Sequence, residues 1–193
     1  MKRRTFDGMV TLVGFGLAIF LFVAAGLLNW GYSFTNNTVA TQLSAQKITL
    51  PVETGNAKES ADVTAFFKAN GAKIMTTGKQ AQMYSDHYLG FHLSAMPPYA
   101  EASTNNRAAA GALKADPENA DLKAASASAA GIVETVFRGT MLQGTLLTTY
   151  AFWQMGQIAK IGAVVMLVGA LLLLLFAMAG WIHLRRTPEE ATI

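Results

Sequence analysis

The sequence predicts an all-α membrane protein with two transmembrane helices and a mainly helical extracytoplasmic domain between them. Three observations lead to this prediction. Charged residues make up only 14% of the 193 residues, against about 25% in a typical soluble domain. The shortage is confined to two stretches, because residues 8–46 and 161–182 contain no Asp, Glu, Lys or Arg. The segment 31–160 carries ten basic and nine acidic residues, the balance of ordinary polar protein.

Residues 9–30 form the first predicted span. At the rise of an α-helix this run is about 33 Å long, enough for a hydrocarbon core of about 30 Å. It exceeds the apolar core of a cleaved signal peptide, and no small-residue cleavage site follows it, so we expect a retained anchor. Arg3-Arg4-Thr5-Phe6 also resembles a twin-arginine export signal, a less favoured interpretation.

Residues 161–182 form the second predicted span. Aromatic residues lie at the ends of both runs, where amphipathic rings favour the headgroup level. The predicted interface anchors are Trp30, Tyr32, Trp153 and Trp181.

Basic residues at the outer ends of the two spans predict the orientation, because Lys and Arg near a span end favour the cytoplasm. The topology-setting residues are Lys2, Arg3, Arg4, Arg185 and Arg186. We therefore expect residues 1–8 and 183–193 in the cytoplasm, with 31–160 outside the plasma membrane. Basic residues gathered at span ends also argue against a nucleic-acid partner, which would require a basic stripe in the folded domain.

Small residues recur along both spans at helical spacing. The candidates for helix packing are Gly14, Ala18, Gly162, Ala163, Gly169, Ala170 and Ala177. Such stripes allow close approach of another helix. Two interpretations stay open: the two spans pack on each other, or the stripes bind helices of a partner.

The intervening segment reads mostly as helix. We expect the first helix to continue past Trp30 to about residue 46, and Ser60 to cap a short helix that ends at Gly71. Residues 47–50 and 72–76 allow one short two-stranded pairing.

Three further helices are expected beyond this pairing. Thr77 and Gln80 have the form of a capping box, followed by one helix up to Met96 with an apolar face on Tyr84, Tyr88, Phe91 and Ala95. A second helix covers about 99–113. Asp116 then caps a helix with Pro117 at its first position, and the absence of proline before Pro188 would let it continue into the second span.

One polar cluster deserves a test as a site, and it comprises Tyr84, Asp86, His87 and His92. A pair of histidines with a carboxylate can bind zinc or iron. However, His87 and His92 are five residues apart, whereas helical ligand pairs are three or four apart, and a third ligand would have to come from Glu134. We expect no metal, no cofactor and no enzyme activity here, with the cluster serving as structure.

Four stretches, MKRRTFDG, TTGKQAQMYSDHYLGFHL, ETVFRGTMLQGTLLTTYAFW and HLRR, resemble a family of actinobacterial two-helix membrane proteins over nearly the whole chain. Some members carry the label "aromatic ring-opening dioxygenase". Such an enzyme needs a compact iron site, which this sequence does not supply. The architecture is also similar to accessory subunits of actinobacterial respiratory supercomplexes.

The sequence therefore favours a non-catalytic accessory or scaffolding subunit of a larger membrane complex, such as a respiratory one, whose partners are other membrane-protein subunits and the lipid bilayer. The alternative is a homo-oligomeric envelope protein whose outer domain binds a ligand or a lipid.

Overall fold

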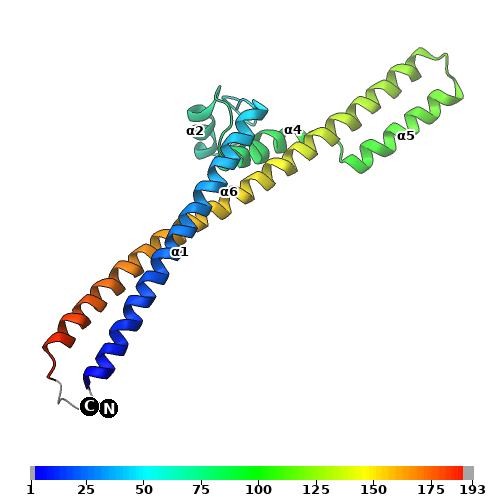
Figure 1. Cartoon of the computed structure of the whole chain (residues 1–193). Helices are drawn as coiled ribbons and strands as arrows, with labels where there is room; N and C mark the ends of the chain where they lie inside the picture. The colour runs from blue at the N-terminus through cyan, green and yellow to red at the C-terminus, as the bar shows by residue number, and fades with distance from the viewer. Residues whose placement is uncertain (1–2, 189–193) are drawn as a thin grey trace. The chain divides into compact units, whose positions relative to one another are not determined.

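The computed structural model describes residues 3–188, which are predominantly helical and contain no strand (Figure 1). The helices in chain order are α1 (Arg3–Gln46), α2 (Ala61–Asn70), α3 (Gly78–Met83), the π-helical turn η1 (Tyr84–Leu89), α4 (Gly90–Ser94), α5 (Tyr99–Ala115) and α6 (Ala120–Arg186). The all-α prediction is confirmed. Helices α1 and α6 are each long and apolar enough to cross a membrane.

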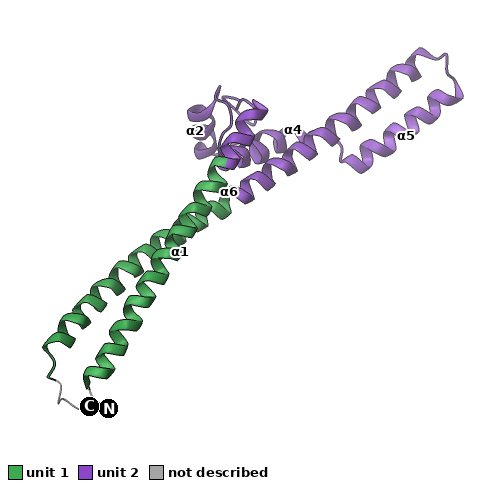
Figure 2. Ribbon diagram, viewed as in Figure 1, with its two compact units in different colours: residues 1–37, 154–193 green, residues 38–153 purple. Residues whose placement is uncertain are grey.

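The chain forms two compact units (Figure 2). Unit 1 contains residues 1–37 and 154–193, and unit 2 contains residues 38–153. In unit 1, parts of α1 and α6 pack as a helix pair. Unit 2 holds the ends of these two helices nearest the middle of the chain, together with all the shorter elements.

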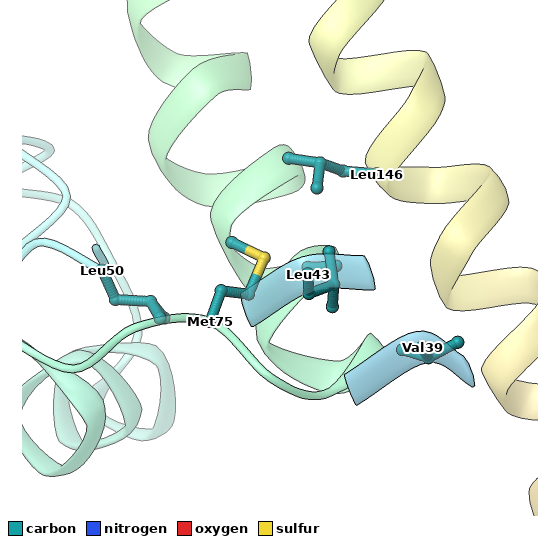
Figure 3. Close-up of a cluster of buried hydrophobic side chains, with 6 residues drawn as sticks. Val39, Leu43, Leu50, Met75 and Leu146 are labelled. Atoms are coloured by element: carbon teal, nitrogen blue, oxygen red, sulfur yellow. The ribbon is translucent and has the colours of Figure 1, made fainter. Parts of the chain in front are cut away.

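The core of unit 2 joins segments that are distant in sequence. Val39 and Leu43 of α1 lie with Leu50, Met75 and Leu146 in one apolar cluster (Figure 3). All five are 2% exposed or less. This cluster fixes the C-terminal end of α1 against α6 and the loop segments, because burying such side chains is the main favourable term in folding.

The expected two-stranded pairing is reduced to a single antiparallel bridge between Thr49 and Ile74. The backbone N–H of Leu50 donates to Lys73 at 3.0 Å, and that of Met75 donates to Ile48 at 2.8 Å. Gly71 follows α2 directly beside Val52, and a Cβ atom there would overlap the Val52 backbone. The close approach of these two segments therefore requires glycine.

Two local predictions are confirmed. Ser60 caps α2, where its hydroxyl accepts from the N–H of Val63. Thr77 and Gln80 form the capping box of α3: the Gln80 N–H donates to Thr77 Oγ1 at 3.2 Å, and the Thr77 N–H donates to Gln80 Oε1 at 3.1 Å.

The predicted start of the last long helix is wrong. Asp116 ends α5 instead of capping the next helix, and α6 begins at Ala120 with Asn119 as its cap. The Asn119 carboxamide oxygen accepts from the N–H groups of Asp121 and Leu122 at 3.0 and 3.2 Å. Pro117 lies in the turn before this cap. Both Asp and Asn cap well, so the local pattern did not distinguish between them.

The helix expected to run regularly from Thr77 to Met96 contains the π-helical turn η1. There the N–H of Gly90 donates to the carbonyl of Ser85, five residues back. This extra residue per turn shifts the face that follows, so Phe91 and Ala95 are exposed and the expected apolar face is lost beyond Tyr88.

Candidate functional site

In unit 1, α1 and α6 run antiparallel and contact each other through small residues at seven-residue intervals. On α1 the buried positions are Thr11, Ala18 and Ala25. On α6 they are Gly156, Ala163, Ala170 and Ala177, and the three alanines are each 7% exposed or less. A seven-residue repeat of this kind keeps one seam of each helix facing the other along the whole contact.

Large side chains of α1 fit over glycines of α6 along this seam. Leu21 lies over Gly169 and Leu28 over Gly162, where their Cδ1 atoms are 3.4 and 3.2 Å from the position a Cβ atom would take. Small residues allow the two backbones to approach closely, which is how helices gain packing energy in lipid.

The seven residues singled out for helix packing all lie in or beside this seam. Gly14 sits against Ala177, where a Cβ atom would lie 3.3 Å from the Ala177 Cβ. The stripes thus face each other within one chain, the first of the two interpretations, and a partner helix would have to use other faces. Thr11, Ala25, Gly156 and Gly180 also belong to the seam, and the sequence pattern did not reveal them as packing residues.

The described basic residues at the paired ends of α1 and α6 are exposed. Arg3 lies 3.9 Å from the carboxylate of Asp7, which is 3.8 Å from His183 Nε2. The guanidinium of Arg185 stacks over the Trp181 ring, 3.8 Å from its centre. Arg4 and Arg186 also lie on the surface, while Lys2 falls outside the described residues.

The four aromatic residues proposed as interface anchors have different surroundings. Trp30 is 68% exposed and stacks on Phe34. The Tyr32 ring lies 4.9 Å from Lys160 Nζ. Trp153 belongs to unit 2, where it is half-buried and packs on the apolar core beside Gly78. Their depth in a bilayer remains a prediction.

The polar cluster on η1 and α4 is held by a network that differs from a metal site. His92 Nδ1 bonds the Tyr88 carbonyl oxygen at 2.7 Å, and Tyr88 packs between Tyr84 and His92 with ring centres 5.0 and 4.4 Å apart. Burial raises the pKa of Tyr84, and the nearby Tyr88 raises it further. Asp86 points to solvent.

His87 pairs with a residue that the sequence did not single out. Its Nδ1 lies 3.1 and 3.2 Å from the two carboxylate oxygens of Glu59. The Glu59 side chain is only 12% exposed. This pair ties the loop before α2 to the π-helical turn, and such a contact between distant segments leaves no periodic signal in the sequence.

Glu59 also lines a cavity of about 360 Å³ beside that loop. Glu53, Thr54, Asn56, Thr64 and Phe67 line it as well. Both hydroxyl groups serve the backbone: Thr54 Oγ1 accepts from the Asn56 N–H at 3.2 Å, and Thr64 Oγ1 donates to the Ser60 carbonyl at 3.1 Å. One of these hydroxyls therefore stabilises the loop and the other the first turn of α2.

Within residues 3–188, no three His, Asp or Glu side chains come together as a group that could hold a metal ion. Glu134, the third ligand considered, instead pairs with Arg138 one turn along α6. The carboxylate that approaches His87 belongs to Glu59, and the contact involves these two residues alone among those described.

The π-helical turn has a structural cause that the sequence did not indicate. Ser85 is fully buried, and its carbonyl accepts from Gln143 Nε2 at 3.0 Å. In return the Ser85 hydroxyl donates to the Gln143 carbonyl at 3.4 Å. This reciprocal pair fixes η1 against α6, and the Ser85 carbonyl accepts both from Gln143 and from the Gly90 N–H of the π-helical turn.

Helix α5 and the first part of α6 form a helical hairpin with little internal packing (Figure 1). Tyr99 at the start of α5 contacts Phe137 of α6, with ring centres 6.0 Å apart. In residues 99–135, all of which the structure describes, Ala102 is the only buried side chain. We name this segment the hairpin arm. Its alanines are mostly exposed, as are the rings of Tyr99 within it and of Phe137 just beyond it.

Comparison of the chain with protein-family models, curated proteins and solved structures finds no match.

Proposed function

We propose that this protein is a two-span membrane protein that acts as a non-catalytic accessory or scaffolding subunit of a larger membrane complex. The hairpin arm would be its partner-binding element. The observation that carries this proposal is the near absence of burial in residues 99–135.

The physical reason is that most helical stability in proteins comes from burying an apolar face, whatever the propensity of the helix itself. Helix α5 has 17 residues and buries one alanine. A covering protein surface would supply the missing burial.

The exposed apolar side chains near the base of the arm support a protein partner. Phe137 is 49% exposed and Met141, one turn further along α6, is 56% exposed. Aromatic residues and Met are enriched at protein interfaces. The resemblance to accessory subunits of respiratory supercomplexes makes a respiratory complex the first partner to examine.

The proposed topology follows the basic residues. Arg3, Arg4, Arg185 and Arg186 would hold both chain ends in the cytoplasm, residues 9–30 and 161–182 would span the bacterial plasma membrane, and 31–160 would lie outside. A reporter fused at Asn106 should then read as external, and one fused after Ile193 as cytoplasmic.

The binding function is tested by co-purification from native membranes in mild detergent. We expect a large complex of membrane subunits to accompany the full chain, and Ala108→Glu with Ala112→Glu, both on exposed positions of α5, to release it. The matched control is Ala65→Glu with Ala69→Glu, which introduces the same charges at the same spacing on α2.

A second function, ligand binding by a homo-oligomer, is favoured by the cavity beside Glu59. Recovery of a pure homo-oligomer with no other subunit would overturn the accessory-subunit proposal in favour of this alternative.

A further inference from the structure

A groove beside the seam of unit 1 has a volume of about 370 Å³. Its apolar walls come from both helices: Phe22, Ala25 and Gly26 of α1, and Ala163, Val164 and Leu167 of α6. The small residues create the hollow, because Gly26 has no atom within 4 Å of the position a Cβ atom would take.

One end of the groove is polar. Asn29 and Lys160 line it there, and both are exposed. Lys160 Nζ lies 4.9 Å from the centre of the Tyr32 ring, a cation–π contact that holds the ammonium group at this end. The groove therefore combines one located positive charge, one amide and an apolar hollow.

The charge has no acidic partner among residues 3–188. Lys160 directly precedes the uncharged run 161–182, and Asn29 lies one residue before the end of the run 9–30. In the proposed topology both residues lie at the outer headgroup level. An anion that meets Lys160 at this depth, with an apolar tail beside it, has the chemistry of a phospholipid.

We propose that this groove is a binding site for one anionic phospholipid of the outer leaflet. Its phosphate pairs with Lys160 and accepts from the Asn29 amide, while one acyl chain lies along Phe22, Gly26, Val164 and Leu167. Burial of the chain supplies affinity and the lysine supplies headgroup selectivity. The inference rests on the membrane insertion in the proposed function, and it does not require a protein partner.

The test uses the full chain, purified in mild detergent and titrated with phosphatidylglycerol or phosphatidylcholine of identical acyl chains. Bound lipid is counted by native mass spectrometry. We expect one phosphatidylglycerol to be retained about fivefold more tightly than phosphatidylcholine, the factor expected for one lysine near an anionic surface. Lys160→Gln should abolish that preference, and Lys160→Arg should keep it.

Gly26→Leu should fill the hollow and remove the bound lipid. Its matched control is Gly16→Leu, on the same helix, since Gly16 is also exposed with no atom within 4 Å of a Cβ position. Lys114→Gln removes an exposed lysine that is distant in sequence from the groove, and it controls for the loss of one positive charge.

Equal retention of the two lipids, or an unchanged preference in Lys160→Gln, would overturn the lipid site. A change of oligomeric state in Gly26→Leu with lipid binding unaltered would also overturn it, because the occupant of the groove would then be a second copy of the chain.

The lipid proposal and the partner proposal fail separately. If the co-purifying complex is absent from the natural chain while phosphatidylglycerol is still bound, only the partner proposal is affected. Extraction of the full chain from membranes by alkaline carbonate would contradict membrane insertion itself.

Discussion

Leu28 and Gly162 fit each other across the seam of unit 1, with the Leu28 Cδ1 atom 3.2 Å from where a Cβ atom of residue 162 would lie. This distance is shorter than an ordinary van der Waals contact, so any side chain at 162 must displace the leucine. We therefore expect Gly162→Leu to weaken helix pairing by roughly 1–3 kcal/mol, the usual cost of overpacking.

The measurement for Gly162→Leu is the free energy of unfolding in detergent micelles, followed by circular dichroism. Gly16→Leu is the control, because that position faces open space and should leave the pairing unchanged. Equal effects of the two substitutions would count against the seam.

A cysteine pair can report the same seam directly, since the natural chain has no cysteine. In the Gly14→Cys, Ala177→Cys double variant the two Cβ atoms would lie 3.3 Å apart, close to the roughly 3.5–4.5 Å found in disulfides. We expect rapid cross-linking under mild oxidation, read as a mobility shift that reductant reverses. Gly16→Cys with Ala177→Cys should not cross-link, and cross-linking of both pairs alike would contradict the packing.

Gly78 and Gly111 should respond to alanine in opposite directions. A Cβ atom on Gly78 would overlap the Trp153 side chain, whereas one on Gly111 meets nothing within 4 Å. Gly78→Ala should lower the free energy of unfolding by about 1–3 kcal/mol through overpacking. Gly111→Ala should raise it by about 0.5–1 kcal/mol, since alanine is the better helix former.

Thermal unfolding of the full chain, monitored by circular dichroism and Trp fluorescence, measures both variants. A stabilising Gly78→Ala would show that Trp153 does not pack against this position.

The Glu59–His87 pair should behave as a structural tie. A double-mutant cycle with Glu59→Gln and His87→Ala should give a coupling of about 0.5–1 kcal/mol in stability, as expected for a partly exposed pair. Metal content by elemental analysis should be the same in all four proteins. Bound zinc or iron in the natural chain that disappears in His87→Ala would instead point to a metal site.

Tyr84 gives the fold a predicted sensitivity to alkali. Burial, with a smaller effect of Tyr88, raises its pKa above the ordinary value of 10.0. The folded state therefore holds the phenolic proton more tightly than the unfolded chain does. The resulting stability is fully present below the ordinary pKa and is lost as the pH rises through the raised pKa.

The difference in unfolding free energy between the natural chain and Tyr84→Phe should then be constant near neutral pH, and the natural chain should lose stability relative to the variant in alkali. The phenolate absorbance missing from Tyr84→Phe should titrate above the ordinary tyrosine range. Its appearance below that range would refute the buried placement.

Long-range charge and hydropathy patterns predicted the two apolar helices, because a run of more than twenty uncharged residues has few alternative structures. Capping patterns likewise predicted the starts of α2 and α3, since a cap is completed within four residues. Ser60 and Thr77 each find their partner three residues away. Asp116 misled because a second good cap, Asn119, follows within the same short turn.

The contacts that could not be predicted from the sequence are those between segments far apart in the chain. The Ser85–Gln143 pair joins residues 58 apart, and the Glu59–His87 pair joins residues 28 apart. Neither has a spacing rule, and the first stabilises a π-helical turn that shifts the face on which Phe91 was expected. The α6 side of the packing seam could be predicted from its stripe of alanines. The burial of Thr11 and Ala25 on α1 could not be predicted, because it depends on the antiparallel register of the two helices.

The separation of the two seam halves along the chain has a consequence for biosynthesis. Gly14 is made more than a hundred residues before Ala177, its counterpart on α6. At roughly 5–20 residues per second, the first helix would wait about ten seconds in the bilayer before its mate emerges from the ribosome. In the proposed topology its small-residue face would meet only lipid during that interval, so any quality-control factor that surveys unpaired membrane segments would act then.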